Sequence, residues 1–194
     1  MAAIEFIEFA RIVLDAIEAL EIEYCIGGSL AVWAWGDQRT TRDFDVVINL
    51  PPEKMYDMSK ELEKRDMLVP FDIILDLYLM SQGDLPINAL HLHATHKAEL
   101  FLLRPGDTFR QQALARRKLV TINEELQNVY VHSPEDLIIY KLRYYKLGGQ
   151  PKHTRDIQTI LDTIGGELDI AYIEQWVKAF DLANEWYRAQ HIRE

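Results

Sequence analysis

The feature that most constrains this chain is a glycine corner followed closely by a pair of aspartates. Gly27, Gly28 and Ser29 precede Asp43 and Asp45, with thirteen residues between the serine and the first aspartate. The run from residue 44 to 50 is rich in β-branched and aromatic residues, which is typical of a strand. Because side chains alternate along a strand, both aspartates are expected on one face. Two carboxylates this close repel each other unless a proton or a cation separates them, and oxygen ligands suit Mg²⁺ or Mn²⁺.

The glycines form the second half of the expected site. Residues 21–26 predict a strand and residues 29–35 predict a short helix, so Gly27 and Gly28 lie at the junction. Glycine allows a tight turn and close approach to a ligand, and Ser29 can cap the helix or donate its hydroxyl to a phosphate. Unpaired backbone N–H groups at such a corner attract anions. An ordinary strand-to-helix turn has the same sequence pattern, so the corner alone leaves both interpretations open.

Taken in order, the strand, Gly-Gly-Ser, a short helix and RTTRDFD (39–45) resemble the signature of the polymerase-beta-like nucleotidyltransferase superfamily. The match is most similar to small prokaryotic nucleotidyltransferases of the abortive-infection and toxin-antitoxin type. The interval between serine and aspartate is somewhat longer than in the commonest form of the motif. The resemblance implies that Gly28 and Ser29 contact the triphosphate of an NTP, with ATP expected, and that Asp43 and Asp45 bind two Mg²⁺ ions.

Two arginines and a third carboxylate extend this expected site. Arg39 and Arg42 are candidates for phosphate contact, although surface ion pairs are an equal alternative. The run 97–103 predicts a strand with Lys97 and Glu99 on one face, and Glu99 is the candidate third carboxylate. Relatives often have aspartate there, so the extra methylene moves the carboxylate by about 1.5 Å. The alternative is that Glu99 faces solvent or pairs with Lys97.

The second half of the chain changes character and becomes helical. Ser133 and the proline after it are typical of a helix start. The segment 133–161 resembles a module that packs beside the nucleotide in the same family. The resemblance assigns that position to a set of charged residues: Glu135, Asp136, Lys141, Arg155 and Asp156. We expect Lys141 to reach a phosphate and Asp156 to orient it, and an ion pair that joins two helices is the alternative.

The predicted fold class is therefore α/β (α+β): a small mixed twisted sheet of nucleotidyltransferase type, flanked by helices. Residues 1–132 are expected to form the core, and residues 133–194 a helical C-terminal segment packed on it. The predicted helices are 2–20, 29–35, 51–65, 71–80 (ending near Gly83), 107–115, 134–148, 153–164 and 170–190. The predicted strands are 22–27, 44–50, 88–93, 97–103, 118–122 and 127–132.

Composition excludes several classes of protein. Hydrophobic residues make up 48% of the 194 residues, which argues against disorder, and no apolar run approaches the length that spans a bilayer. The net charge of −10 argues against an extensive non-specific nucleic-acid surface. The single cysteine, Cys25, has no partner for an internal disulfide, which favours a cytoplasmic protein.

Three further patterns have competing interpretations. Asp72 and Asp76 share one face of a helix, where a solvated acidic edge is favoured over a site. The segment HLHATH (91–96) places two imidazoles, those of His91 and His93, on one face of an expected strand, a spacing that could bind zinc. No accompanying cysteine or carboxylate pattern supports a closed zinc site. Trp33 and Trp35 flank the corner and could stack on a base, although core packing is the usual role of such residues.

The function that these patterns favour is Mg²⁺-dependent transfer of a nucleoside monophosphate from an NTP to an acceptor hydroxyl of RNA, protein or a small molecule. One alternative is a noncatalytic antitoxin or partner-binding module of the same fold, with a protein partner encoded nearby. A second alternative is a divalent-metal phosphohydrolase. The sequence does not select the acceptor.

Overall fold

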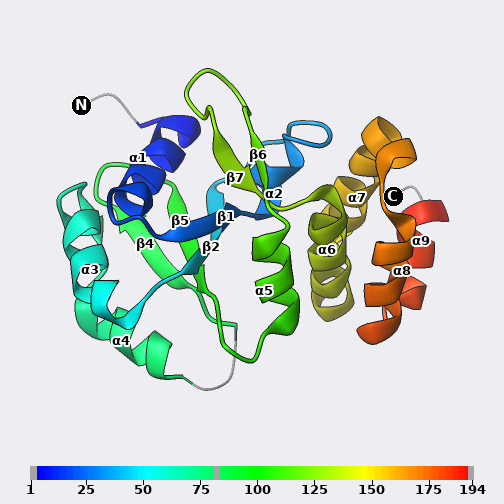
Figure 1. Cartoon of the computed structure of the whole chain (residues 1–194). Helices are drawn as coiled ribbons and strands as arrows, with labels where there is room; N and C mark the ends of the chain where they lie inside the picture. Colours follow the sequence, from blue (N-terminus) through cyan, green and yellow to red (C-terminus); the bar gives the residue numbers. More distant parts are fainter. Residues whose placement is uncertain (1–3, 81–83, 192–194) are drawn as a thin grey trace.

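The computed structural model describes residues 4–80 and 84–191 and shows one mixed sheet flanked by helices (Figure 1). The sheet has seven strands in the order β3-β4-β5-β2-β1-β7-β6. The pairs β1/β7 and β2/β5 are parallel, and the other neighbours are antiparallel. The predicted mixed α/β fold class is therefore confirmed.

The strands lie close to their predicted positions, with one exception. Their bounds are β1 Glu23–Ile26, β2 Asp43–Asn49, β3 Met67–Leu68, β4 Ile87–His91, β5 Lys97–Leu102, β6 Lys118–Val120 and β7 Val129–Val131. The sequence did not predict β3, because two residues are too few to show an alternating pattern. It pairs with the end of β4 at the edge of the sheet.

Helices connect these strands and form the end of the described chain. They are α1 Phe6–Ala19, α2 Gly28–Val32, α3 Met55–Glu63, α4 Phe71–Leu79, α5 Thr108–Ala115, α6 Pro134–Gly148, α7 Pro151–Ile164, α8 Ile170–Ala179 and α9 Ala183–His191. Two short 3-10 turns, η1 Pro52–Lys54 and η2 Gly165–Glu167, precede α3 and follow α7. The predicted start of the first helix at residue 2 and the predicted end near Gly83 lie outside the described residues.

The two faces of β2 have different roles. Phe44, Val46 and Ile48 are fully buried and belong to the main core, to which Phe9 and Val13 of α1 also contribute. On the opposite face, Val47 packs with Cys25 and with Leu114 of α5. Cys25 is thus a buried core residue. Because the strand alternates, this second face also carries Asp43 and Asp45 at one end of β2.

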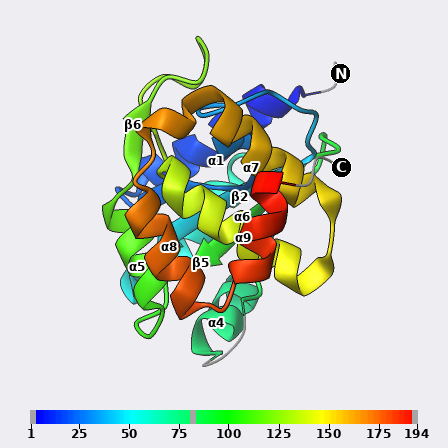
Figure 2. The same ribbon diagram turned by 90° about the vertical axis from the view of Figure 1, so that its right-hand side faces the viewer.

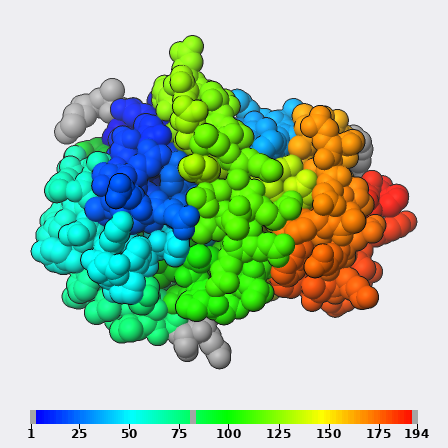
Figure 3. Space-filling model, in the orientation of Figure 1, coloured from blue at the N-terminus to red at the C-terminus, as the bar shows by residue number. Residues whose placement is uncertain are grey.

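The helices from α6 onward pack beside the sheet. Viewed from the side of the C-terminal helices, α6, α8 and α9 lie in front of β2 and β5 (Figure 2). On the surface, α8 and α9 form one flank of the molecule (Figure 3). Helix α6 begins as predicted, since the Ser133 side chain accepts a hydrogen bond from the backbone N–H of Asp136. Ten of its fifteen residues are buried. This helix therefore serves as an inner wall of the fold.

Two predicted elements differ from the structure. The single helical region expected over 170–190 is two helices, because Asp181 adopts a left-handed conformation (φ 53°) between α8 and α9. The strand expected to reach residue 93 ends at His91, and His93 lies in the following turn. The imidazoles of His91 and His93 therefore do not share a strand face. In the described part of the chain, no helix has both the length and the apolar character needed to cross a membrane.

Candidate functional site

The parallel pairing of β2 and β5 places the three predicted carboxylates on one face of the sheet. In the register, Asp43 lies opposite Lys97 and Asp45 lies opposite Glu99. Residues paired across neighbouring strands point to the same side, so all four side chains share the face that carries Val47. The three carboxylates line a pocket of about 730 Å³ that also includes the glycine corner and residues of α6 and α7.

Asp45 and Glu99 form the centre of this acidic group. They are paired across β2 and β5, and their carboxylates lie close enough for the charge of Glu99 to act directly on Asp45. Burial, and after it the charge of Glu99, raises the pKa of Asp45 to about 6, against the opposing effect of the Lys141 ammonium. Two carboxylates held together in this way are stabilised by any cation that enters between them.

Lys97 supplies one positive charge at the same place. Its Nζ atom lies 2.5 Å from Oε1 of Glu99 and 3.6 Å from Oδ1 of Asp43. The bond to Glu99 raises the pKa of Lys97, so this side chain remains an ammonium. The alternative interpretation of Glu99 as a partner of Lys97 therefore holds in the structure, alongside its contact with Asp45.

The glycine corner packs directly against Asp45. The backbone N–H of Gly27 donates to the carbonyl of Asp45 at 2.8 Å, which fixes the corner to β2. Gly28 has a left-handed φ of 56°, and a Cβ atom there would collide with the Asp45 carboxylate. The helix begins one residue earlier than predicted. Gly27 is its N-cap residue and Ser29 lies in the first turn, so the expectation of a Ser29 cap is wrong.

A second charged group, formed by Arg39, Lys141 and Asp156, lies on another wall of the pocket. Lys141 Nζ is 2.6 Å from Oδ2 of Asp156, and the Arg39 guanidinium binds both oxygens of the same carboxylate at 2.7 and 3.0 Å. Burial opposes the charge of Asp156, but the hydrogen bond from Arg39 and the charge of Lys141 prevail and lower its pKa. Burial lowers the pKa of Lys141, and Asp156 counteracts this.

The alternative interpretation of Lys141 and Asp156, an ion pair that joins the two helices α6 and α7, holds in the structure, and the contact of Lys141 with a phosphate stays a prediction. The group faces the pocket through Arg39 and Lys141. One carboxylate shared by two cations leaves one positive charge uncompensated within the group. The part of the pocket formed by Arg39 and Lys141 is therefore cationic and suits an anion.

Several residues line the pocket in addition to the predicted site, and His132 among them was missed by sequence reasoning. They are His132, Tyr140, Tyr144, His153 and Arg110. Tyr144 and His153 stack with ring centroids 5.9 Å apart, and burial lowers the pKa of His153 to about 4, so it is neutral at pH 7. The tyrosine-rich face of α6 was the one available signal, because the others come from separate elements that only the fold brings together.

Other predicted residues lie elsewhere. Arg42 is exposed at the pocket mouth, whereas Arg155 is exposed and is not part of the lining. Asp72 and Asp76 are exposed on α4, as the favoured interpretation expected. Trp33 packs on Phe6, and Trp35 donates its indole N–H to the carbonyl of His132 at 2.9 Å.

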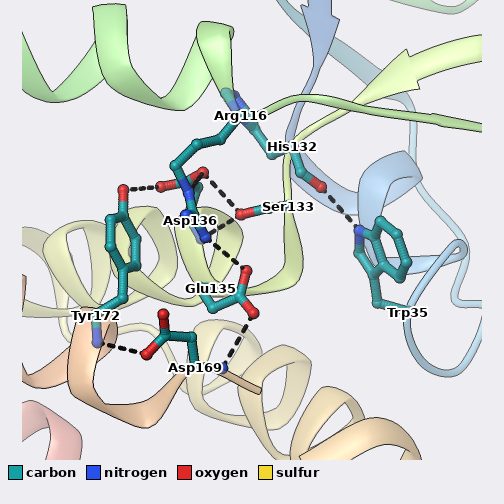
Figure 4. Close-up of polar contacts among 8 residues, drawn as sticks. All are labelled: Trp35, Arg116, His132, Ser133, Glu135, Asp136, Asp169 and Tyr172. Atoms are coloured by element: carbon teal, nitrogen blue, oxygen red, sulfur yellow. Dashed lines mark hydrogen bonds and ion pairs between the residues drawn. The ribbon is translucent and has the colours of Figure 1, made fainter. Parts of the chain in front are cut away.

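Glu135 and Asp136 do not line the pocket, in contrast to the expectation for this module. Figure 4 shows them in a separate network at the start of α6. Asp136 accepts hydrogen bonds from Ser133 Oγ at 2.7 Å and from Tyr172 Oη at 2.6 Å. Arg116 lies 3.2 Å from Glu135 and 3.3 Å from Asp136. These residues connect the end of α5, the start of α6 and the start of α8, which is a structural role.

The acidic group fits a divalent cation in its chemistry, although it is not a preformed metal cage. Three carboxylates are the ligands that Mg²⁺ and Mn²⁺ prefer. The close approach of Asp45 and Glu99, both half-buried, is the observation that supports the fit. Within the described residues, however, no three His, Cys, Asp or Glu side chains are gathered closely enough to hold an ion. Binding an ion would therefore require Asp43 to move toward the other two.

Comparison with known proteins supports the fold. No protein-family model matches the chain, and no curated protein matches it in sequence. Among solved structures, ANT(2'')-Ia in complex with adenylyl-2''-tobramycin aligns with a TM-score of 0.61 and 16% identity, covering 90% of this chain and 96% of that one. A solution structure of the antibiotic-resistance factor ANT(2'')-Ia aligns with a TM-score of 0.60 and 15% identity over 95% and 96%.

A third solved structure agrees with these two. An antigenic nucleotidyltransferase-like protein from Paracoccidioides brasiliensis aligns with a TM-score of 0.56 and 20% identity, covering 94% of this chain and 90% of that one. Each alignment spans nearly the whole of both chains. The chain therefore has the fold of these proteins, over the sheet and the C-terminal helices alike.

Proposed function

We propose that this protein is a nucleotidyltransferase that moves a nucleoside monophosphate from an NTP to an acceptor hydroxyl. The observation that carries the proposal is the contact of Asp45 with Glu99 beside the Gly28 corner, inside one pocket. The same pocket also contains the cations of Arg39 and Lys141. Carboxylates that require a cation, next to a cationic wall, suit a triphosphate that arrives with a metal ion.

Each group in the pocket has a role in this reaction. The backbone at Gly28 and Ser29 approaches the triphosphate closely, because no side chain projects from Gly28. Lys141 and Arg39, both oriented by Asp156, balance the negative charge of the phosphates. A Mg²⁺ or Mn²⁺ ion on Asp43, Asp45 and Glu99 would supply charge neutralisation at the reacting phosphate. Arg42, which is exposed and lines the pocket, would contact the outer phosphates.

The chemical step is an in-line displacement. The acceptor oxygen forms a bond to the α-phosphorus of the NTP, the bond from that phosphorus to the bridging oxygen breaks, and pyrophosphate leaves. The hydroxyl proton is taken by a carboxylate of the acidic group, for which Glu99 is the candidate. Positioning and charge stabilisation provide most of the catalysis in such a reaction.

The acceptor class and the cellular role belong to this proposal as well. ATP is the expected nucleotide, and RNA, protein and small molecules each offer a suitable hydroxyl. Residues 1–132 serve as the nucleotidyltransferase core, and residues 133–194 as the helical segment that supplies Lys141 and Asp156. A toxin-antitoxin context, with a protein partner encoded nearby, agrees with the resemblance found in the sequence.

The direct test is a product analysis. The protein is incubated with Mg²⁺ or Mn²⁺, each α-³²P-labelled NTP and a cell extract as the source of acceptors. We expect label on an acceptor and release of pyrophosphate, both lost in the variant with Asp43→Asn and Asp45→Asn. Release of orthophosphate would instead support a phosphohydrolase. Nucleotide binding without any labelled product would support the noncatalytic module.

A further inference from the structure

We propose that Lys97 replaces one of two metal ions at the acidic group, so that the site takes a single divalent cation. The inference rests on the proposed function, because it concerns the cation that the reaction would use. The resemblance in the sequence implies two ions at such a site, and Lys97 is the feature of this chain that departs from that expectation.

The position of Lys97 follows from the sheet. It begins β5, two residues before Glu99, and therefore points to the same face. In the register it lies opposite Asp43. Its ammonium contacts Glu99 at 2.5 Å and Asp43 at 3.6 Å, so it fills the space between the outermost aspartate and the third carboxylate.

The charges around the acidic group support one ion. Asp43, Asp45 and Glu99 together carry three negative charges when ionised, and Lys97 cancels one of them. The remaining two match one divalent cation. Arg39 and Lys141 also face this part of the pocket, and with Asp156 they contribute a further positive charge. A second divalent ion in the protein alone would therefore meet an excess of positive charge.

The arrangement of the ligands agrees with the charges. Asp45 and Glu99 contact each other, and an ion that enters between them has two carboxylates available. A second ion would need Asp43 as a shared ligand, but Asp43 already faces the ammonium of Lys97. The described residues also contain no ready group of three metal ligands. Lys97 thus blocks the outer half of the site and leaves the inner half accessible.

The test is a titration of the full chain with Mn²⁺, in which electron paramagnetic resonance measures the free ion. We expect one Mn²⁺ per chain in the wild type and two in Lys97→Met, with the first ion bound about tenfold more tightly in the variant because a repelling charge is gone. Lys97→Arg keeps the charge and should still bind one ion. Lys118→Met, an exposed lysine on β6 outside the pocket, is the matched control and should equal the wild type.

The outcomes separate the two proposals. Two ions in the wild type, unchanged in Lys97→Met, would overturn the role of Lys97 and leave nucleotidyl transfer standing. No bound ion in any variant would overturn the single-cation site, and pyrophosphate release would then decide the proposed function independently. Lys97→Gln serves as a second neutral variant if circular dichroism shows that Lys97→Met is unfolded.

Discussion

Asp45 is the residue on which the pocket depends most. It touches the glycine corner through its backbone and side chain, and its carboxylate lies beside that of Glu99. Its surroundings favour the neutral form, since burial and a neighbouring carboxylate both oppose its charge. A residue held in an unfavourable state in this way is typical of a functional site, where a ligand later provides the compensation.

The first prediction concerns the cost of that charge. In the folded chain the pKa of Asp45 is about 6, above the 3.8 of an ordinary aspartate. The folded state therefore binds the proton more tightly, so the free energy of unfolding falls as the pH rises from 4 to 6 and the penalty is fully present above 6. Asp45→Asn should stabilise the protein without ligands by about 1 to 2 kcal/mol at pH 8.

The stabilisation should shrink toward zero as the pH falls to 4. Urea unfolding at pH 8, 6 and 4 measures it, and Asp72→Asn on the exposed face of α4 is the control that should change little. An Asp45→Asn protein less stable than the wild type at pH 8 would show that the carboxylate has a compensating partner in the folded chain.

The second prediction concerns the Gly28 corner. Gly28 and Gly149 both have a left-handed backbone, with φ of 56° and 61°. Of the two, only Gly28 has atoms packed where an added Cβ atom would lie. Gly149→Ala should cost about 1 to 2 kcal/mol for the backbone alone. Gly28→Ala should cost more, because its Cβ atom meets the Asp45 carboxylate. Thermal unfolding of both variants separates the collision from the backbone effect, and equal losses would contradict the close packing.

At the scale of elements, the pairing of α6 with α7 is what positions the cationic wall. Lys141 and Asp156 are both buried, and they lie on different helices. Two charges withdrawn from water are tolerated only while they compensate each other, so this pair fixes the alignment of the two helices at the pocket. A surface pair such as Lys146 with Asp181 does not fix the alignment of its helices in this way, because water stabilises each charged partner alone.

The third prediction follows from this difference. Asp156→Ala leaves a buried ammonium without its partner and should cost about 3 to 5 kcal/mol. Combining Lys141→Met with Asp156→Leu removes both charges and should recover much of the loss. Lys146→Met should cost less than about 1 kcal/mol. Urea unfolding provides the values, and an Asp156→Ala protein as stable as the wild type would mean that Lys141 finds another partner.

The sequence predicted elements well where local chemistry determines them. Ser133 and Pro134 specify the start of α6 through a cap and a fixed φ, and the alternation in β2 places its aspartates correctly. Prediction failed where tertiary contacts decide. The two-residue β3 exists only because β4 lies beside it, and the break after α8 depends on a single left-handed residue, Asp181.

The candidate site was predictable only in part for the same reason. Asp43 and Asp45 share a strand, so their common face follows from the sequence. Glu99 joins them only because β5 pairs with β2 in one particular register. The prediction that Glu135 and Asp136 lie beside the nucleotide was wrong. A helix that begins with acidic residues has the same sequence pattern whether those residues line a pocket or, as here, pair with Arg116.

At the scale of the whole molecule, the pocket gathers parts that lie far apart in the chain. The glycine corner, two parallel strands, α6 and α7 each contribute one side. A ligand that bridges these parts binds only the folded arrangement and must therefore stabilise it. The stability of the entire chain thus reports on the occupancy of this one pocket.

The fourth prediction uses this linkage. Mn²⁺ together with α,β-methylene-ATP, at about one hundred times the dissociation constant, should add about 2.7 kcal/mol. For a chain of this size that corresponds to a rise in Tm of roughly 5 to 10 °C. Differential scanning fluorimetry provides the measurement, with the Asp43→Asn and Asp45→Asn double variant as the control. An unchanged Tm at saturating ligand would contradict the assignment of the pocket.

The segment between α2 and β2 is held by a helix that comes more than a hundred residues later. Gly36 packs against Thr159, the N–H of Asp37 donates to the Thr159 hydroxyl at 2.7 Å, and Arg39 binds Asp156. Both partners belong to α7. A ribosome that has synthesised the chain only through β5 has therefore made every acidic residue of the pocket, yet the pocket rim can settle only after α7 has been made. The complete pocket should thus form late in synthesis, once α7 is present.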